Sequence, residues 1–406
     1  MLVFKNARLI DGTGKPPVEG CTICIHAARF CAVGPGCEIP GGANVIDLQG
    51  KTVIPGLSDA HTHFSGSSDF DRPGFGRRRE TYNYIEAREF FLDWGVTTVR
   101  TCGDIGSEIL SYCRDAEKEQ RTTPRVLPVG PWFQAGDGHP GYTVGPQVGL
   151  NDEATLRDAA VIIDENTDIE AETRRVAEMG VFEIKAFLGH INKGNYPVPV
   201  PHMTEQQLVR IVRQAHALGK RVICHVDDPI EMEMAVRAGV DGVEHMLADG
   251  AEHTEFSREL IDLLLERKTV VDPTMISIQR WDHQVPRSQP VYEKLKAAVG
   301  QLYRAGVTMA VGCDSGIPFV PFGESLHDEM KCLNEAGIPA LEVLRMATSG
   351  NAAIFGLSDE LGSIEAGKQA DLLVLDADPL EDIENTKKIL LVMQSGRILR
   401  DRMLRA

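Results

Sequence analysis

Length, composition and charge narrow the classes of protein to which this chain can belong. It has 406 residues, 43% of them hydrophobic and 25% charged, which is typical of a globular protein with one large and one smaller domain. The formal net charge of -17 argues against nucleic acid and anionic membranes as partners, because both bind basic surfaces. The sequence has no apolar run of membrane-spanning length and no signal-peptide pattern at its start, so we expect a cytoplasmic protein.

Both ends of the chain have the pattern of short β-strands joined by tight turns. Residues 1–51 contain runs such as LVFKNARLIDG and CTICIHAARFCAVG. Residues 358–406 repeat this pattern in GSIEAGKQADLLVLD and KILLVMQSGRILRD. Neither end can cover the faces of its own strands. We therefore expect the two ends to pair into one small β-sandwich beside a main domain of residues 52–357.

Four of the nine cysteines lie close together near the N-terminus, at Cys21, Cys24, Cys31 and Cys37. Their spacing is one that a structural zinc site could use. The same segment also has the pattern of two strands joined by a turn, in which the thiols are small apolar side chains, and we favour this interpretation. An odd number of cysteines spread over the whole chain argues against a disulfide framework.

The main domain alternates strand-like and helix-like segments. The clearest helix is MTEQQLVRIVRQAHALGK, in which Thr204 and Gln207 fit a capping box and Gly219 fits the C-terminal stop. Eight strands that alternate with helices predict a parallel (β/α)8 TIM barrel, an α/β fold. The strands are expected at 52–60, 96–102, 125–131, 181–187, 221–226, 242–246, 269–275 and 307–313.

A doubly wound open sheet is the alternative fold for the same alternation, and it would suit a nucleotide-binding enzyme. No phosphate-binding loop of the form G-x-G-x-x-G or G-x-x-x-x-G-K-[ST] follows any predicted strand. We therefore favour the barrel, whose active sites lie at the C-terminal ends of the strands.

Polar residues close several of the predicted barrel strands at that end. His61 and His63 stand two residues apart in SDAHTHF, so both side chains point to the same face of a strand. One such histidine would be uninformative, but several metal-binding side chains at one end of a barrel indicate a divalent first-row metal such as zinc. The candidate ligands are His61, His63, Lys185, His225, His245 and Asp314.

Lys185, within the apolar strand FEIKAF, does not suit a metal site while its amine is charged. Reaction of the amine with CO2 would give a carbamate, an anion whose two oxygens could bridge two metal ions. The alternative is an ion pair between Lys185 and Glu183 or Asp314. The apolar flanks make such an isolated buried pair a poor source of stability.

These residues, in this order and each on its own strand, resemble the amidohydrolase superfamily. PGLSDAHTHF, SGNAAIFGL and LGSIEAGKQADLLVLDADP are also similar to it, so the resemblance covers essentially the whole chain. With Lys185 the chain resembles the binuclear branch, which has a carboxylated lysine. AGDGHPG, and DSG around Asp314, resemble the prolidase-like and carboxypeptidase-like metal dipeptidases and relatives that cleave other N-acyl amino acids.

The resemblance implies a role for each matching residue. It assigns His61, His63 and Asp314 to a first metal, His225 and His245 to a second, and carboxylated Lys185 to the bridge between them. His139 would face the scissile carbonyl or an acid group of the substrate. We expect hydrolysis of an amide-type C–N bond in a dipeptide, an N-acyl amino acid or a related amide or carbamate. Asp314 would carry the proton from a metal-bridged hydroxide to the leaving amine.

The strand-end loops bear on the substrate, and His139, Tyr142 and His190 are the residues expected to contact it. The loop FLGHINKGNYPVP departs from the glycine-rich or serine-containing stretch that the resemblance leads us to expect after Lys185. His190 is therefore also explained as a solvated loop residue. A run of arginines at 77–79 could hold a substrate carboxylate, although a solvated charge run is the favoured interpretation.

Large apolar side chains in the same loops have two interpretations. They could line a pocket for an apolar part of the substrate, or they could pack the loops onto the barrel. Apart from Tyr142, the residues concerned are Trp132, Phe133, Met275, Trp281, Phe319 and Phe322.

Two other functions remain as alternatives. A mononuclear deaminase would resemble the two-histidine motif but would not need Lys185, and it would use a glutamate near a later histidine. Glu244 precedes His245, yet on a strand its side chain points the opposite way. A non-enzymatic scaffold with the same barrel would be expected to have lost ligands, whereas all six positions are filled here. A homo-oligomer is compatible with the resemblance.

Overall fold

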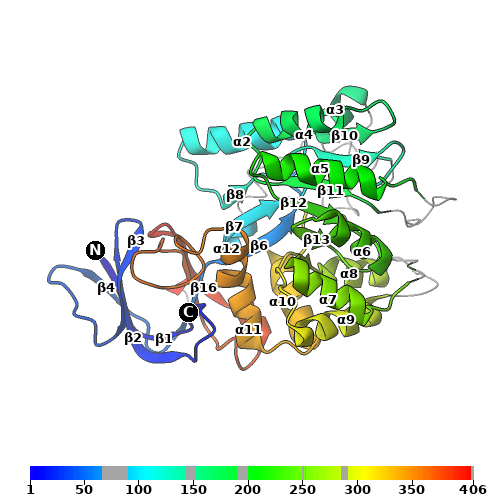
Figure 1. The fold of residues 1–406 in the computed structure, drawn as a ribbon. Helices are drawn as coiled ribbons and strands as arrows, with labels where there is room; N and C mark the ends of the chain where they lie inside the picture. Colours follow the sequence, from blue (N-terminus) through cyan, green and yellow to red (C-terminus); the bar gives the residue numbers. More distant parts are fainter. Residues whose placement is uncertain are drawn as a thin grey trace.

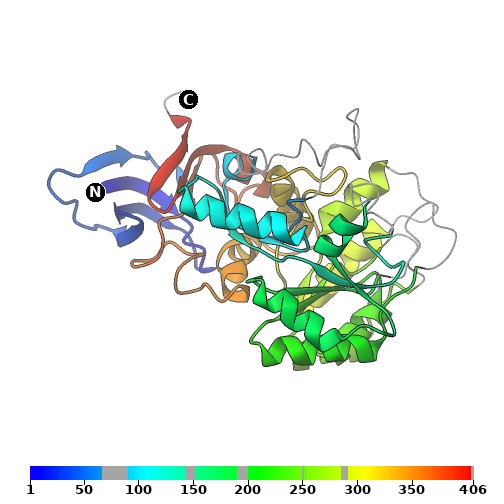
Figure 2. The same cartoon turned by 90° about the horizontal axis from the view of Figure 1, so that it is seen from above.

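The computed structural model describes residues 1–65, 90–142, 152–189, 200–248, 251, 253–284 and 291–403. A small sheet lies at one side of the molecule, and a larger part of strands surrounded by helices lies at the other (Figure 1). The sheet contains the first and the last strands of the chain, so both termini lie on the small part (Figure 2). The predicted α/β fold with a small β domain is therefore confirmed.

The small sheet joins the two ends of the chain, as predicted. Its strands follow the order β17-β16-β15-β5-β1-β2-β3, and β4 pairs with β1 in addition. Phe4 and Ile23 from the N-terminal end pack with Leu372 and Met393 from the C-terminal end in one buried cluster. The strands are β1 Leu2–Leu9, β2 Val18–His26, β3 Arg29–Pro35, β4 Asn44–Asp47, β5 Thr52–Pro55, β15 Leu372–Leu375, β16 Ile389–Gln394 and β17 Arg397–Asp401.

The cysteines near the N-terminus lie on β2, on β3 and just after β3. Cys21 and Cys24 are buried, and burial raises the pKa of the Cys21 thiol to about 11. A raised thiol pKa opposes the thiolate form that zinc binds. The structure therefore favours the interpretation of Cys21 and Cys24 as apolar packing residues.

The predicted strand 52–60 is two strands that belong to different sheets. β5 pairs with β1 and β15 in the small sheet, whereas β6 (Leu57–Thr62) pairs with β7 in the larger part. The chain changes partners at Gly56, where a Cβ atom would lie 2.4 Å from Thr97 Oγ1. Only glycine fits this close approach. The hydrophobic pattern could not reveal the change, because both strands are fully buried. The exact domain boundaries stay a prediction.

Parallel strands of the larger part form two ladders. One has the order β6-β7-β8 and the other the order β10-β9-β11-β12-β13-β14. The strands after β6 are β7 Val96–Thr101, β8 Arg125–Leu127, β9 Trp132–Ala135, β10 Ala160–Ile163, β11 Ile184–Phe187, β12 Val222–His225, β13 Gly242–Glu244 and β14 Val270–Asp272. The predicted strand 125–131 thus corresponds to β8 alone, and β9 follows it directly.

Backbone hydrogen bonds connect the two ladders. The predicted strand 307–313 lies in the described part of the chain but is not continuous; it has single bridges instead, such as Met309 with Val271. Ala310 N donates to Val271 O of β14 (2.9 Å), and Ala60 N of β6 donates to Val311 O (3.0 Å). This segment therefore occupies the place of the eighth strand, between β14 and β6.

Helices surround the strands of the larger part (Figures 1 and 2). The capping box at Thr204 and Gln207 is present at the start of α5, as predicted. No helix in the described ranges combines the length and the apolar character that a membrane crossing needs. The helices are α2 Gly106–Lys118, α3 Glu153–Ala159, α4 Ile169–Glu178, α5 Glu205–Ala217, α6 Pro229–Ala238, α7 Arg258–Arg267, α8 Met275–Gln284, α9 Tyr292–Ala305, α10 Glu324–Glu335, α11 Ala340–Arg345, η3 Met346–Gly350, α12 Asn351–Ile354 and η4 Ile383–Lys387.

His327 on α10 is expected to make the fold sensitive to acid. It is fully buried, with Nε2 2.9 Å from Trp94 O and Nδ1 2.9 Å from Thr386 Oγ1. Burial lowers its pKa from 6.5 to about 4, so the unfolded chain binds a proton there that the folded chain does not. Folding stability should therefore fall as the pH drops from 6.5 toward 4, by about 3 kcal/mol over the whole window.

The measurement for this prediction is urea unfolding at pH 5 and pH 7, for the wild type and for His327→Gln. Comparing the two proteins cancels the other groups that titrate in this range. We expect the wild type to lose more stability than the variant on going to pH 5. Equal losses in the two proteins would rule out His327 as the origin of the acid sensitivity.

Candidate metal centre

Three of the predicted ligands meet where β6 ends. His61 is the fifth residue of β6, and His63 follows the strand, so their two-residue spacing brings both side chains to the same side. Asp314 Oδ1 lies 3.4 Å from His61 Nε2 and 3.1 Å from His63 Nε2. The ligand atoms of the three residues lie within 4.8 Å of one another, which is close enough for one metal ion.

Hydrogen bonds on the far side of each ring fix which nitrogen can coordinate. His63 Nδ1 lies 2.9 Å from Gly103 O, a group that can only accept, so Nδ1 carries the proton. His61 Nδ1 lies 2.7 Å from a carboxylate oxygen of Glu244. In both rings Nε2, the nitrogen nearest Asp314, is therefore the one that could coordinate a metal ion. Burial, followed by the charge of Lys185, holds the pKa of His61 well below 6.5, which favours the neutral imidazole that a metal needs.

His225 and His245 continue this group of rings. The His245 ring centroid is 4.9 Å from that of His61 and 4.4 Å from that of His225. His225 Nε2 lies 3.0 Å from Asp227 Oδ1, which places the lone pair of this ring on Nδ1. His245 Nδ1 lies 2.6 Å from Thr274 Oγ1, so Nε2 is the ring nitrogen on the side away from Thr274. Each histidine thus has a partner that orients it, as is usual for metal ligands.

Backbone conformation supports a functional role for two of these positions. His245 has a φ of 69° and Asp314 a φ of 61°, in the left-handed region that residues other than glycine rarely adopt. Such conformations cluster at functional sites, where the surrounding structure maintains them. Both residues follow the last position of a barrel strand, so the unusual backbone turns their side chains toward the site.

Lys185 lies in the middle of β11 and is fully buried. Its Nζ has no hydrogen-bond partner among the described residues and lies 4.8 Å from the ring centroid of Phe187. The alternative ion pairs are not formed. Glu183 bonds Arg100 instead (3.0 Å), and Asp314 contacts His63. A buried ammonium without an acceptor is costly, so this amine fits a metal-binding carbamate better than an ordinary lysine.

The predicted substrate residues differ in how the structure places them. His139 is buried, and its ring centroid lies 4.7 Å from that of His225, beside the group of histidines. Tyr142 is 52% exposed on the same loop. His190 and the arginines at 77–79 lie outside the described residues. His139 is therefore the predicted substrate residue with the strongest structural support.

Most of the large apolar side chains expected in the strand-end loops have packing roles, and the loop placement is wrong for four of them. Trp132 and Phe133 lie on β9, and Met275 and Trp281 lie on α8. Phe133, Met275 and Phe322 belong to the main buried core, which supports the packing interpretation for them. Trp132 packs against Phe187 with ring centroids 6.1 Å apart. Trp281 and Phe319 are partly exposed and form an edge-to-face pair at 5.3 Å. This pair remains a candidate for contact with an apolar substrate group.

The sequence interpretation missed the residues that orient the ligands. Glu244 faces His61, Asp227 faces His225, and Thr274 faces His245. From the sequence alone, Glu244 suggests only the acid of a deaminase. A signal was present, because Glu244 is a charged residue inside a short apolar strand, GVEHM, where it must find a buried partner.

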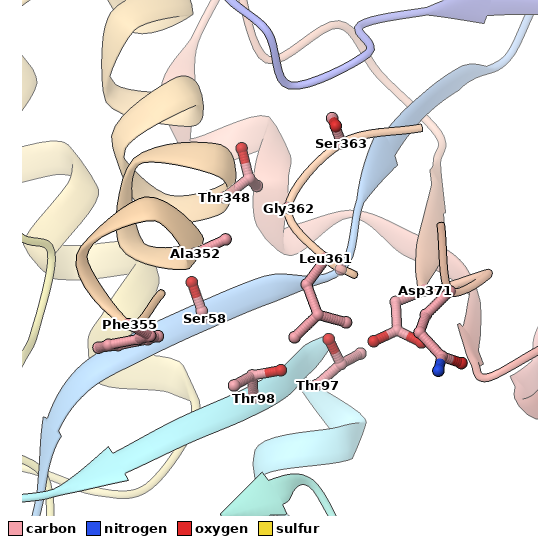
Figure 3. A pocket seen from close by; sticks show the side chains of 12 residues that line it. Ser58, Thr97, Thr98, Thr348, Ala352, Phe355, Leu361, Gly362, Ser363 and Asp371 are labelled. Atoms are coloured by element: carbon pink, nitrogen blue, oxygen red, sulfur yellow. The ribbon is translucent and has the colours of Figure 1, made fainter. Parts of the chain in front are cut away.

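A hollow at the other end of the barrel strands contains none of the predicted ligands (Figure 3). Its lining includes Ser58, near the start of β6, and Thr97 and Thr98, near the start of β7. The loop around Leu361 and the carboxylate of Asp371 close it from the side of the small sheet. It lies at the N-terminal ends of the strands, where barrel enzymes do not place their active sites.

A parallel αβ barrel that brings together four imidazoles and an aspartate at the C-terminal strand ends, with a buried lysine within a strand, is the arrangement expected of a metal-dependent hydrolase. The chain belongs to the Amidohydrolase family, whose model matches residues 52–399. It is therefore an enzyme, a hydrolase of C–N bonds, in a family that generally uses metal ions.

Individual relatives agree with this assignment. The ochratoxinase of Aspergillus niger is 24% identical, and the match covers 97% of this chain and 85% of that protein. A solved Xaa-Pro dipeptidase with bound methionine has a TM-score of 0.84 and 25% identity, with 98% of this chain and 99% of that one covered. A putative prolidase from Bifidobacterium longum has a TM-score of 0.78 and 26% identity, with 98% and 94% covered.

Proposed function

We propose that the chain is a binuclear metal hydrolase that cleaves the amide bond of a dipeptide or an N-acyl amino acid. The observation that carries this proposal is the amine of Lys185, which is fully buried and has no hydrogen-bond acceptor among the described residues. Its charge is close enough to His61 to lower the pKa of that imidazole. A bridging carbamate on this amine is an economical explanation. The likeness to a solved Xaa-Pro dipeptidase supports the substrate class.

The chain offers two sets of donors for a pair of divalent ions, for which zinc suits the imidazole-rich donors. His61, His63 and Asp314 would hold one ion, His225 and His245 the other, and the Lys185 carbamate would stand between them. When bound, the ions supply an activated water and polarise the substrate carbonyl. Phe187 covers the Lys185 amine and stacks on His225 at 4.9 Å, which keeps bulk water away from this side.

Asp314 is the residue that moves the proton. Its Oδ1 lies 3.4 Å from His61 Nε2 and 3.1 Å from His63 Nε2, so the carboxylate faces the position of the ion that these three residues would hold. It accepts a proton from the attacking water as the new C–O bond forms, and it gives this proton to the nitrogen as the C–N bond breaks. His139 binds the carbonyl oxygen or the acid group of the substrate from the side of His225.

The position of Glu244 does not support the deaminase alternative. Its two carboxylate oxygens contact Arg100 (2.7 Å) and His61 (2.7 Å), and the side chain is buried. It is therefore held inside the barrel and is not placed to protonate a substrate. The relatives named above are enzymes, and all six candidate ligand positions are filled, which argues against the alternative of a non-enzymatic scaffold.

The experiment that tests the substrate class is a hydrolysis screen with the zinc-loaded enzyme. The panel contains Xaa-Pro and other dipeptides, N-acyl amino acids, and aminated heterocycles that a deaminase would use. We expect release of a free amino acid from members of the first two groups and no release of ammonia from the third. Release of ammonia alone would contradict the proposal and support a deaminase.

A further inference from the structure

Arg100 of β7 is one of the largest fully buried side chains in the described part of the chain. Its guanidinium uses three of its nitrogens in separate contacts inside the barrel. Nε donates to Ala60 O (2.7 Å), Nη1 to a Glu183 carboxylate oxygen (3.0 Å), and Nη2 to a Glu244 carboxylate oxygen (2.7 Å). The proposed reaction assigns no role to this group.

Each partner of Arg100 comes one or two residues before a candidate metal ligand in the sequence. The pairs are Ala60 with His61, Glu183 with Lys185, and Glu244 with His245. The guanidinium therefore contacts the layer of residues directly below the ligands, and it does so on three of the strand segments that carry them.

Arg100 also contacts one ligand through an intermediate side chain. One carboxylate oxygen of Glu244 accepts from Arg100, and the other lies 2.7 Å from His61 Nδ1. A second series of contacts runs from Arg100 through Asp272 to the backbone near Asp314. Asp272 Oδ2 lies 3.7 Å from Arg100 Nη2, and Asp272 Oδ1 accepts from Gly312 N at 3.1 Å.

β7 has no direct backbone pairing with β11 or β13. β7 pairs with β6 and β8, whereas β11 and β13 lie in the other ladder of parallel strands. The side chain of Arg100 reaches across the interior and contacts Glu183, next to β11, and Glu244 of β13 directly. The planar guanidinium suits these contacts, because its donors point in fixed directions.

We propose that Arg100 is a positioning residue for the metal centre, an inference that rests on the proposed function. It holds β6, the start of β11 and β13 at the separation that lets His61, Lys185 and His245 face one metal pair. Through Glu244 it also keeps His61 in the tautomer whose Nε2 can coordinate. Loss of a residue that orients metal ligands typically lowers metal affinity about 10- to 100-fold.

The test compares Arg100→Met with a matched control, Arg125→Met. Arg125 is also an arginine on a barrel strand in contact with a carboxylate, Asp371 at 3.1 Å, but it contacts no residue next to a ligand. Zinc affinity is measured on folded, metal-free protein by competition with a chelating dye, and folding is checked by circular dichroism. We expect about 10- to 100-fold weaker zinc binding for Arg100→Met and wild-type affinity for Arg125→Met.

Glu244→Gln tests the same inference with a smaller change, in case Arg100→Met does not fold. Arg100 and His61 each contact a different carboxylate oxygen of Glu244. In glutamine an NH2 donor replaces one of these oxygens, so one of the two contacts is lost. We expect weaker zinc binding here as well. Wild-type affinity in a folded Arg100→Met chain, or in Glu244→Gln if the former does not fold, would overturn the inference while leaving the proposed function intact. A wild-type chain that binds no zinc would overturn both.

Discussion

Replacement of Lys185 by alanine is expected to lower turnover by about 10³-fold or more. The amine of Lys185 is fully buried beside the histidines and has no hydrogen-bond acceptor among the described residues. Its proposed carbamate would supply the anion between the two metal ions, and stabilisation by such a centre contributes several kcal/mol to the transition state. The measurement is kcat with the best substrate of the hydrolysis screen, at saturating zinc.

Lys220→Ala is the matched control for this prediction. Lys220 lies between α5 and β12 and is partly buried, and its Nζ donates to Val181 O at 2.6 Å. Small carboxylates such as acetate should partly restore the activity of Lys185→Ala, because they can enter the space that the lysine leaves and supply a bridging anion. The prediction fails if Lys185→Ala turns over as fast as Lys220→Ala.

Replacement of Asp314 by asparagine is expected to lower kcat about 10²- to 10⁴-fold, the range typical for loss of a general acid–base group. Asparagine keeps the size of the side chain and an oxygen that can face His63, but its amide cannot take a proton from water. The substitution should therefore lower kcat more than it changes KM. Steady-state kinetics of the zinc-loaded variant give both constants.

Asp241→Asn controls for the loss of a carboxylate beside a histidine. Asp241 Oδ2 lies 2.8 Å from His216 Nε2, but it also accepts from Val222 N at the start of β12, far from the strand ends that carry the ligands. We expect this variant to keep its kcat. An Asp314→Asn enzyme with the same kcat as Asp241→Asn would exclude Asp314 as the proton carrier.

Those features of the candidate site that depend on the spacing of neighbouring residues and on the direction of the strands could be predicted from the sequence. The two-residue spacing of His61 and His63 fixes their common direction, and parallel strands bring their C-terminal ends to one edge. These two rules suffice to bring His225, His245 and Asp314 to the same place without knowledge of any long-range contact. The same holds for the capping box of α5, which depends only on neighbouring residues.

The parts that could not be predicted depend on contacts across the barrel. Whether Glu183 pairs with Lys185 or with Arg100 is decided by how β7 and β11 face each other, which no periodicity in the sequence reveals. The change of sheet at Gly56 has the same origin, since both strands are equally apolar. Charged residues inside apolar strands, as in VTTVRTC and VFEIKAF, are a signal of such buried pairs, although they do not identify the partner.

The central claim is that the chain holds two metal ions bridged by Lys185, and the most direct test is a count of metal ions. Wild type and Lys185→Ala are purified without a chelating tag, and the metal content of each is measured per chain by mass spectrometry. We expect about two divalent ions in the wild type, falling to one or none in the variant. One ion per chain, unchanged by the substitution, would contradict the bridged centre and leave Lys185 as a structural residue.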